Sequence, residues 1–167
     1  MINPRTILVV DDEVDFLSSM RRSLRKEPYQ VTTSDNGSAA LQLLAHHEIS
    51  LVISDYKMPE MDGLILLKKI RLDYPHIITI MLTALSEVDI AMKAVNDVGV
   101  YKFFMKPIEI NSLKVTLRRA LESLDLIVER DDLLQKIKRR DNVLNGLERK
   151  YPGISHVDLD ADGNYII

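Results

Sequence analysis

The stretch LVISDYKMPEMDG, residues 51–63, decides the fold. It begins with an apolar run of strand length, and Asp55 follows this run directly. A loop containing Pro59 then leads to Gly63. A carboxylate at the end of a buried strand does not stabilise an apolar core, so Asp55 either caps a turn or takes part in chemistry. The other strand ends of the sequence decide between these two roles.

Length and composition are those of a globular protein of ordinary size. The chain has 167 residues, of which 46% are hydrophobic and 28% charged, and its formal net charge is −3. This charge gives no general reason to bind nucleic acid or an anionic membrane. Cysteine is absent, which excludes disulfides and thiolate chemistry. No apolar run approaches the ~20 residues of a membrane span, and the N-terminus does not resemble a signal peptide, so we expect a cytoplasmic protein.

Strand-like and helical patterns alternate over the first three quarters of the chain. Several apolar runs are nearly continuous, as expected for parallel strands buried on both faces. We predict strands at residues 6–10, 29–33, 49–54, 77–82 and 101–104. Residues at helical spacing lie between them, and the first such stripe, Val14, Leu17, Met20 and Leu24, is expected to face the core.

The alternation of strand and helix implies parallel pairing with right-handed crossovers. The predicted fold class is therefore α/β, a doubly wound five-stranded parallel sheet in the flavodoxin-like order 2-1-3-4-5, followed by an extended C-terminal helix. In such a sheet, ligands bind beyond the carboxyl ends of the strands, near the point where the strand order reverses.

The last helical pattern continues beyond the expected end of this domain. From Asn111 onward, leucines recur at a spacing of three to four, and a less regular pattern runs on to the sequence Tyr151-Pro152-Gly153. Asp131 and Asp141 lie on or near the apolar seam, so the heptad pattern is imperfect. Two interpretations remain open: a solvated helix that caps the domain, or a helix that pairs with its own copy in a homodimer or with another partner. We favour the second.

The final residues predict a short β-hairpin-like tail around an Asp-Gly turn. Residues 158–163, DLDADG, also match the first half of a calcium-binding loop, but the sequence stops before the position of the bidentate glutamate. We favour the hairpin. The predicted division is thus an α/β domain at residues 1–124, a helical extension with coiled-coil character at 125–150, and the tail at 151–167.

Polar residues gather at the predicted strand ends. The first strand is followed by the acidic run 11–13, the third ends in Asp55, the fourth ends in Thr83, and Lys106 follows the fifth. Because the carboxyl ends of parallel strands meet at one edge of a sheet, we expect carboxylates, a hydroxyl and an ammonium group to converge on one crevice.

Carboxylates packed together repel one another unless a cation joins them. Oxygen ligands without Cys or His indicate a hard divalent ion, and Mg²⁺ fits best because it commonly binds one or two carboxylates together with phosphoryl oxygens. Taken alone, Asp12 or Thr83 could cap a helix, and Asp55 could form a turn. Lys106 alone would be a surface lysine. The occurrence of all of them at successive strand ends favours a binding site.

Four motifs resemble one known family in order, spacing and strand context. The segments ILVVDDE, SDYKMPEMDG, MLTA and FFMKP look like the receiver domain of bacterial two-component response regulators, over about residues 5–124. The resemblance implies phosphorelay signal transduction, in which the domain accepts a phosphoryl group from a sensor histidine kinase or a phosphotransfer protein. It implies Mg²⁺ as the cofactor. It does not imply a conventional enzyme, because such a domain only assists its own phosphorylation and dephosphorylation.

The resemblance also implies roles for residues around the metal. Asp55 matches the phosphoacceptor, and Asp12 matches the direct magnesium ligand. Asp11 matches a ligand that acts mostly through water, and Lys57 a residue that lends its backbone carbonyl to the ion.

Further roles concern the phosphoryl group and the conformational switch. Thr83 matches the hydroxyl that contacts the phosphoryl group, and Lys106 matches the lysine that pairs with it. Phe103 matches the aromatic switch residue, whereas Tyr101 lies outside the matching position. The bond between Lys106 and Pro107 is often cis in the family.

Two other classes of protein fit parts of this pattern less well. Flavin-binding domains share the strand order, but they need a phosphate-binding loop after the first strand, where this chain has acids. An aspartyl-phosphate phosphatase would carry Asp-x-Asp there, whereas these acids are adjacent. For the output, the alternative is a receiver fragment of a longer regulator whose effector domain is absent. No helix-turn-helix pattern follows residue 124, so we expect no direct nucleic-acid binding.

Overall fold

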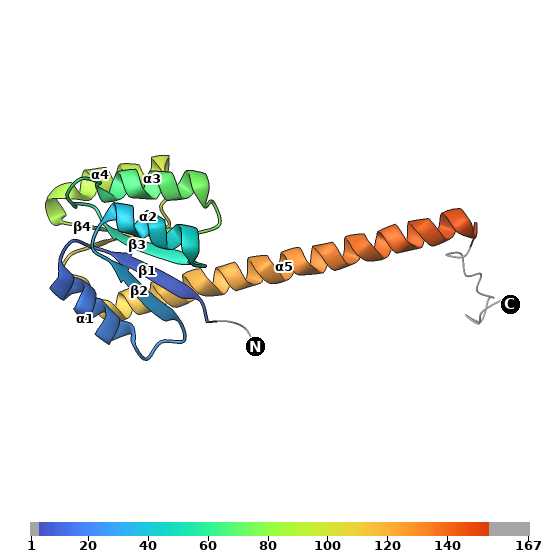
Figure 1. Ribbon diagram of the computed structural model, residues 1–167, viewed down its shortest axis with the longest axis horizontal. Coiled ribbons are helices and arrows are strands. Elements are labelled where there is room, and N and C mark those ends of the chain that lie inside the picture. Colours follow the sequence, from blue (N-terminus) through green and yellow to red (C-terminus); the bar gives the residue numbers. More distant parts are fainter. Residues whose placement is uncertain (1–3, 154–167) are drawn as a thin grey trace. The chain divides into compact units, whose positions relative to one another are not determined.

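The computed structural model describes residues 4–153, apart from the side chains of residues 94 and 95. The chain divides into two compact units, Met1–Leu121 and Glu122–Ile167. In the first unit, a five-stranded parallel sheet is covered by helices on both faces (Figure 1).

The elements of the sheet and its helices follow the predicted alternation. The strands are β1 (Thr6–Val10), β2 (Gln30–Ser34), β3 (Leu51–Asp55), β4 (Ile78–Thr83) and β5 (Lys102–Met105). The helices are α1 (Val14–Leu24), α2 (Gly37–His46), α3 (Gly63–Asp73), α4 (Val88–Asp97) and α5 (Ile110–Lys150), with a short 3-10 helix, η1 (Leu85–Glu87), before α4. All strand pairs are parallel and the order is β2-β1-β3-β4-β5, so the predicted fold class and strand order are confirmed.

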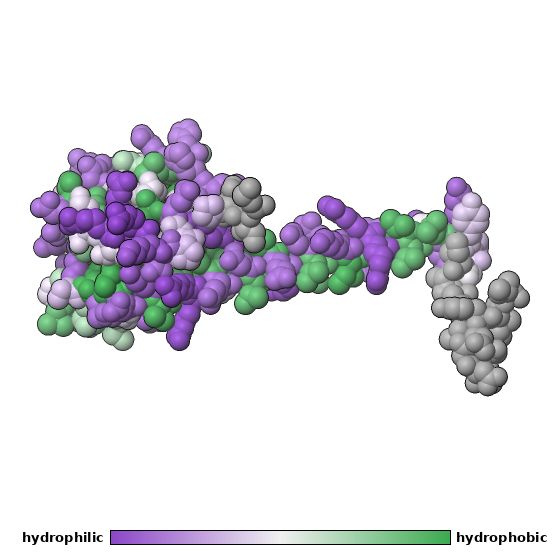
Figure 2. Space-filling model, turned by 90° about the horizontal axis from the view of Figure 1, so that it is seen from below, coloured by the Kyte–Doolittle hydropathy of each residue, from purple (hydrophilic) through white to green (hydrophobic). Residues whose placement is uncertain are grey.

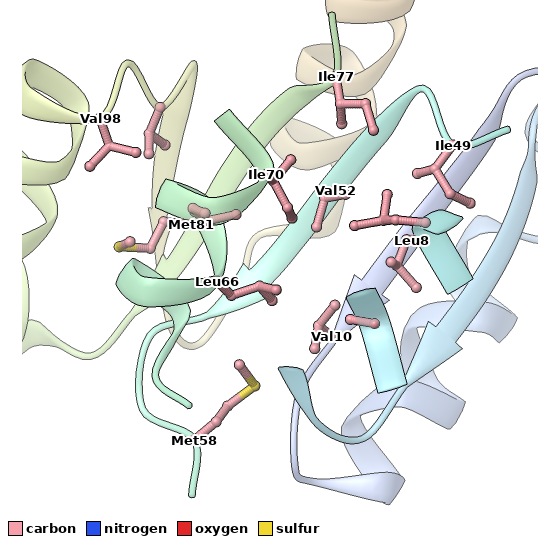
Figure 3. Close-up of a cluster of buried hydrophobic side chains, with 14 of the residues drawn as sticks. Leu8, Val10, Ile49, Val52, Met58, Leu66, Ile70, Ile77, Met81 and Val98 are labelled. Atoms are coloured by element: carbon pink, nitrogen blue, oxygen red, sulfur yellow. The ribbon is translucent and has the colours of Figure 1, made fainter. Parts of the chain in front are cut away.

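The apolar core lies between the sheet and its helices. All five residues of β3 are buried, which explains why its sequence is nearly continuous in apolar residues. On one face, Leu8, Val10 and Val52 of the central strands cluster with Leu66 and Ile70 of α3 (Figure 3). Burial of each such side chain contributes about 1.5–3 kcal/mol, so this packing supplies most of the favourable free energy of folding.

The stripe predicted on α1 is correct except at its first residue. Leu17, Met20 and Leu24 are buried, but Val14 is 63% exposed. At 3.6 residues per turn, Val14 lies roughly 90° around the helix from the mean direction of the other three, which places it off the buried face.

The loop after β3 returns closely to the strand it leaves. The Gly63 backbone N–H donates a hydrogen bond to the Tyr56 carbonyl at 2.8 Å. A Cβ atom at Gly63 would overlap the Asp55 carbonyl oxygen, so only glycine permits this close approach. Asp62 then caps α3 by accepting a hydrogen bond from the Ile65 backbone N–H at 2.8 Å. The loop therefore holds the end of β3, and with it Asp55, against the start of a helix.

In the second unit, α5 continues from Glu122 to Lys150. The last buried residue of α5 is Leu121, and residues 125–147 are all exposed. The hairpin-like tail predicted at residues 151–167, with its calcium-loop alternative, falls largely on residues 154–167, which lie outside the described residues. Between residues 4 and 153, no helix has both the length and the apolar character needed to cross a membrane.

Candidate functional site

Three carboxylates meet at the carboxyl ends of β1 and β3. These strands are neighbours in the sheet, and Asp11, Asp12 and Asp55 each offer an oxygen within 4.8 Å of the others. Asp11 is fully buried, Asp55 is 7% exposed, and Asp12 is exposed to solvent. The strand order thus brings together acids that lie more than forty residues apart in the sequence.

The ammonium group of Lys106 lies among these acids. Its Nζ atom is 2.7 Å from Asp11 Oδ2, 3.3 Å from Asp55 Oδ1 and 3.6 Å from Glu13 Oε1. The same Nζ lies 4.5 Å from the centroid of the Phe16 ring on α1, a distance typical of a cation–π contact. Lys106 therefore balances part of the negative charge of the cluster.

Burial and neighbouring charges both shift the pKa values of Asp55 and Lys106. Burial raises the pKa of Asp55 to about 6; Lys106 opposes this shift, and the neighbouring charges of Asp11 and Asp12 add to it. For Lys106, burial by itself would lower the pKa, but its bonds to Asp11 and Asp55 outweigh burial and the pKa is raised. A further cation at this cluster would relieve the repulsion that burial intensifies.

The donor set fits a hard divalent cation. The cluster offers carboxylate oxygens only, and Asp12 opens to solvent, so an ion there could keep several water ligands. Asp12, Asp55 and Lys106 line an open cleft of about 530 Å³, with the exposed Lys57 on its rim. This space accommodates an ion together with a phosphoryl group, as Mg²⁺ sites commonly do.

Thr83 is buried at the end of β4, next to β3. Its hydroxyl is directed toward the Ala84 carbonyl at 3.3 Å and Glu87 Oε2 at 3.5 Å. The Ala84 backbone N–H donates to the same Glu87 oxygen at 3.2 Å. Glu87 also lines the cleft, so in this conformation its carboxylate engages two donors at the site.

The capping roles considered for Asp12 and Thr83 are wrong. The N-cap of α1 is Glu13, and no side chain makes a capping hydrogen bond there. The N-cap of η1 is Ala84 rather than Thr83. Neither side chain is therefore explained by helix termination.

Phe103 lies on β5 and packs, half-buried, against the core cluster. In the ladder between β4 and β5, Phe103 pairs with Met81, and Met105 pairs with Thr83. Paired residues lie on the same face of a sheet, and side chains two residues apart on a strand also share a face. Phe103 therefore lies on the same face as Met81 and as Thr83, which is two residues further along β4. Tyr101 precedes β5 and is 48% exposed. The Lys106-Pro107 bond is cis.

Two residues of the site had no role in the sequence-based prediction. Phe16 reaches Lys106 from the first turn of α1, and Glu87 reaches Thr83 from η1. Both residues lie a few positions after a predicted strand end, at the start of the next helix. That position in the sequence was the only signal that could have pointed to them. Which helical residue turns back to the sheet edge depends on the exact start of the helix.

The structure defines an α/β domain with an acidic cluster at the carboxyl ends of its central strands. The family described as response regulator receiver domain matches residues 7–118, and the chain belongs to this family. Receiver domains interact with histidine kinases or other phosphodonors, and they are not conventional enzymes.

Curated relatives are longer regulators. The transcriptional regulatory protein ZraR of Klebsiella oxytoca is 36% identical over 115 residues, which are 69% of this chain and 26% of that protein. The C4-dicarboxylate transport transcriptional regulatory protein DctD of Rhizobium meliloti is 32% identical over 128 residues, which are 77% of this chain and 28% of that protein. The chain thus spans about a quarter of the length of these relatives.

Solved structures agree with the family. The signal receiver domain of an HD domain-containing protein from Pseudomonas fluorescens Pf-5 has a TM-score of 0.70 at 35% identity, over 74% of this chain and 98% of that one. NtrX from Brucella abortus, in complex with ADP, has a TM-score of 0.71 at 31% identity, over 78% of this chain and 30% of that one.

Proposed function

We propose that Asp55 accepts a phosphoryl group from the phosphohistidine of a sensor histidine kinase or phosphotransfer protein. The observation that carries this proposal is the position of Asp55, which ends β3 in an open cleft with Lys106 Nζ 3.3 Å from its carboxylate. A carboxylate oxygen of Asp55 attacks phosphorus, the P–N bond breaks, and its electron pair stays with the histidine nitrogen. The product is an acyl phosphate on Asp55.

The other residues of the site position and neutralise the transferred group. Lys106 pairs with the negative charge that a phosphoryl group adds beside Asp55, and the Thr83 hydroxyl donates to it after turning away from Glu87. Asp11, Asp12 and Asp55, with the backbone carbonyl of Lys57, would hold Mg²⁺. When bound, the ion would supply positive charge that stabilises the transferring phosphoryl group. Positioning and charge neutralisation account for most of the catalysis in such transfers.

Water hydrolyses the acyl phosphate and resets the domain. The side chains that flank the site, Lys57 and Leu85, are exposed and are expected to tune this rate. This self-assisted reaction turns over no diffusible substrate.

Phosphorylation acts through a switch that we assign to Thr83 and Phe103. Movement of Thr83 toward the phosphoryl group vacates space on its face of the sheet, and Phe103, half-buried on that same face, occupies it. Because phenylalanine has no hydroxyl, the switch works by packing alone. It reshapes the surface of α4, β5 and α5, from which the output is read.

The output in this proposal is homodimerisation through the helical extension. Residues 1–124 form the receiver domain, residues 125–150 the extension with coiled-coil character, and residues 151–167 a short tail. The proposal also assigns the chain to the cytoplasm, where ATP-dependent kinases act. A second candidate is the receiver part of a longer regulator, because the curated relatives are about four times the matched length. Any nucleic-acid binding would then belong to the further domain.

An Asp55→Asn variant tests the phosphoacceptor. Incubation with a phosphorylated histidine kinase domain or acetyl phosphate and Mg²⁺ should add one phosphoryl group to the wild-type protein and none to the variant, measured by intact mass. Asp62→Asn is the matched control, because Asn also caps the start of α3 and Asp62 does not line the cleft. Undiminished phosphorylation of Asp55→Asn would refute the assignment.

Sedimentation tests the coupling between site and output. The wild-type protein with Mg²⁺ and beryllofluoride, a phosphoryl mimic, should dimerise more tightly than the Asp55→Asn variant under the same conditions. Equal dimerisation of the two would contradict the proposed switch while leaving phosphorylation itself untouched.

A further inference from the structure

The exposed part of α5, Glu122–Lys150, carries an apolar stripe that nothing in the described chain covers. Figure 2 shows hydrophobic side chains along this part of the helix, between hydrophilic ones. The stripe consists of Ile127, Leu134, Ile137 and Leu144, each 43–49% exposed. Leu126, Leu133 and Leu147 flank it, with exposed fractions of 39–66%.

These residues follow a heptad repeat. If Ile127 is assigned to position a, Leu134 is also at a, and Ile137 and Leu144 are at d. The flanking leucines then all fall at g. Two core positions within the run are charged and of opposite sign: Arg130 at d and Asp141 at a.

The charged core positions discriminate between the two directions in which a second copy could pair. In a parallel, in-register dimer every core residue faces its own copy, so Arg130 would face Arg130 and Asp141 would face Asp141. Like charges facing each other in an interface cost several kcal/mol. In an antiparallel dimer, position a faces position d of the partner, so unlike residues meet.

One antiparallel register matches every core layer between Ile127 and Leu144, and the layer beyond them pairs Ser123 with Glu148. With the two-fold axis midway between residues 135 and 136, Ile127 faces Leu144 and Leu134 faces Ile137. The same axis brings Arg130 opposite Asp141. Each apolar residue of the stripe thus meets an apolar partner, and each of the two core charges within the stripe meets its opposite.

Two of the four pairs beside the core support this register, while the other two place Leu133 beside Arg140 and Leu124 beside Asn145. In antiparallel pairs, position e lies beside e of the partner and g beside g. Asp131 and Lys138 are both at e and meet across the axis, and Leu126 meets Leu147 at g. In a parallel pair, g lies beside e of the partner, so Leu126 would lie against Asp131 instead. The Asp131–Lys138 and Leu126–Leu147 contacts therefore favour the same direction as the core layers.

The length of the exposed helix agrees as well. Glu122–Lys150 has its midpoint at residue 136, next to the axis that the side chains require. Lys150, the last helical residue, falls opposite Leu121, the last buried residue of α5.

In the single chain, Arg130 bonds its neighbour Asp131 at 2.8 Å, but both side chains are more than half exposed, so exchanging this ion pair costs little.

We propose that Glu122–Lys150 pairs with a second copy of this chain as an antiparallel two-stranded coiled coil, with its two-fold axis between Gln135 and Lys136. The inference rests on the proposed homodimer and adds its direction and register. At ~1.5 Å per residue, the paired helices extend over roughly 44 Å.

Disulfide trapping tests direction directly, because the natural chain has no cysteine. The full chains Ile127→Cys and Leu144→Cys are oxidised separately and as an equimolar mixture, in the presence of Mg²⁺ and beryllofluoride, and the products are weighed by intact mass. The proposal expects cross-linking only in the mixture, between one chain of each kind. Cross-linking of each variant with itself, and none between them, would overturn the antiparallel direction while the homodimer stands. A monomer by sedimentation would overturn both, whereas phosphorylation of Asp55 is read separately by mass.

A charge exchange supplies a second test that does not depend on cysteine. Arg130→Asp would place two acids together in each charged layer and should weaken dimerisation about tenfold or more. The double variant Arg130→Asp/Asp141→Arg restores opposite charges across an antiparallel interface and should recover wild-type affinity. Arg139→Asp, at the outward position f, is the matched control and should change little. Failure of the double variant to recover affinity, with helix content unchanged by circular dichroism, would overturn the proposed register.

Discussion

The receiver domain and the exposed helix depart from the usual distribution of side chains in opposite directions. In the receiver domain, Asp11 and Asp55 are buried beside each other, whereas in the helix Leu134 and Ile137 are about half exposed. Crowded buried carboxylates and solvated apolar side chains are each unfavourable on their own. In the proposals above, a cation relieves the acids, and the helix of a second copy covers the apolar stripe. The two exceptions are therefore the features on which the proposed metal site and the proposed helix pairing rest.

The largest expected effect tests whether the two regions differ in burial. Leu67→Ala removes a fully buried side chain from the receiver core and should lower the free energy of unfolding by about 2–5 kcal/mol. Leu134→Ala, on the exposed helix, should change it by no more than about 0.5 kcal/mol. Urea denaturation measures both changes, at protein concentrations low enough for the chain to be monomeric. Similar losses for the two variants would mean that Leu134 is packed within the single chain.

The proposed metal site is tested by adding Mg²⁺. Mg²⁺ at a hundred times its dissociation constant should raise the free energy of unfolding by about 2.7 kcal/mol. Asp12→Ala should abolish this gain without destabilising the metal-free protein, because Asp12 is exposed and its charge raises the pKa of Asp55. Asp15→Ala, in the first turn of α1, serves as the control and should keep the response. An undiminished Mg²⁺ response in Asp12→Ala would refute its assignment as a ligand.

The smallest expected effect concerns Glu87, the acid that adds to the negative charge of the cleft. Its carboxylate accepts hydrogen bonds from the Ala84 N–H and from the Thr83 hydroxyl, which is the donor proposed for a phosphoryl group on Asp55. Glu87→Gln should accelerate phosphorylation by acetyl phosphate a few-fold, since the Coulomb repulsion between partly exposed charges is on the order of 0.5–1 kcal/mol. Asp89→Asn, exposed in the first turn of α4, is the control. A slower Glu87→Gln variant would show that the carboxylate assists the reaction.

Most of the fold could be predicted because a parallel sheet covered on both faces marks its central strands by their apolar composition. The ends of these strands were predicted less accurately: β3 was expected at residues 49–54 and lies at Leu51–Asp55. Strand ends depend on backbone hydrogen bonds with neighbouring strands, such as that from Ser50 N–H to the Thr6 carbonyl at 2.9 Å. Val14 was misplaced for a related reason, since helical spacing alone does not give the direction of the buried face.

The candidate site was predictable to the extent that its residues end strands. A doubly wound sheet collects all its carboxyl ends at one edge, so strand order alone brings Asp11, Asp55 and Lys106 together. Phe16 and Glu87 stand on helical turns instead. Their approach to Lys106 and Thr83 depends on where each helix starts and how it packs, which no short sequence pattern records.

The amino-acid sequence by itself determined the periodicity of each element, the chemical type of each strand end and the order of charges along the helix. These properties are local, because they follow from neighbours in the chain. Tertiary structure alone decided the distances: Lys106 reaches Asp11 at 2.7 Å across 95 residues, and the Thr83 hydroxyl faces Glu87 instead of Asp55. Such contacts depend on how strands and helices pack together, and packing is a property of the whole folded chain.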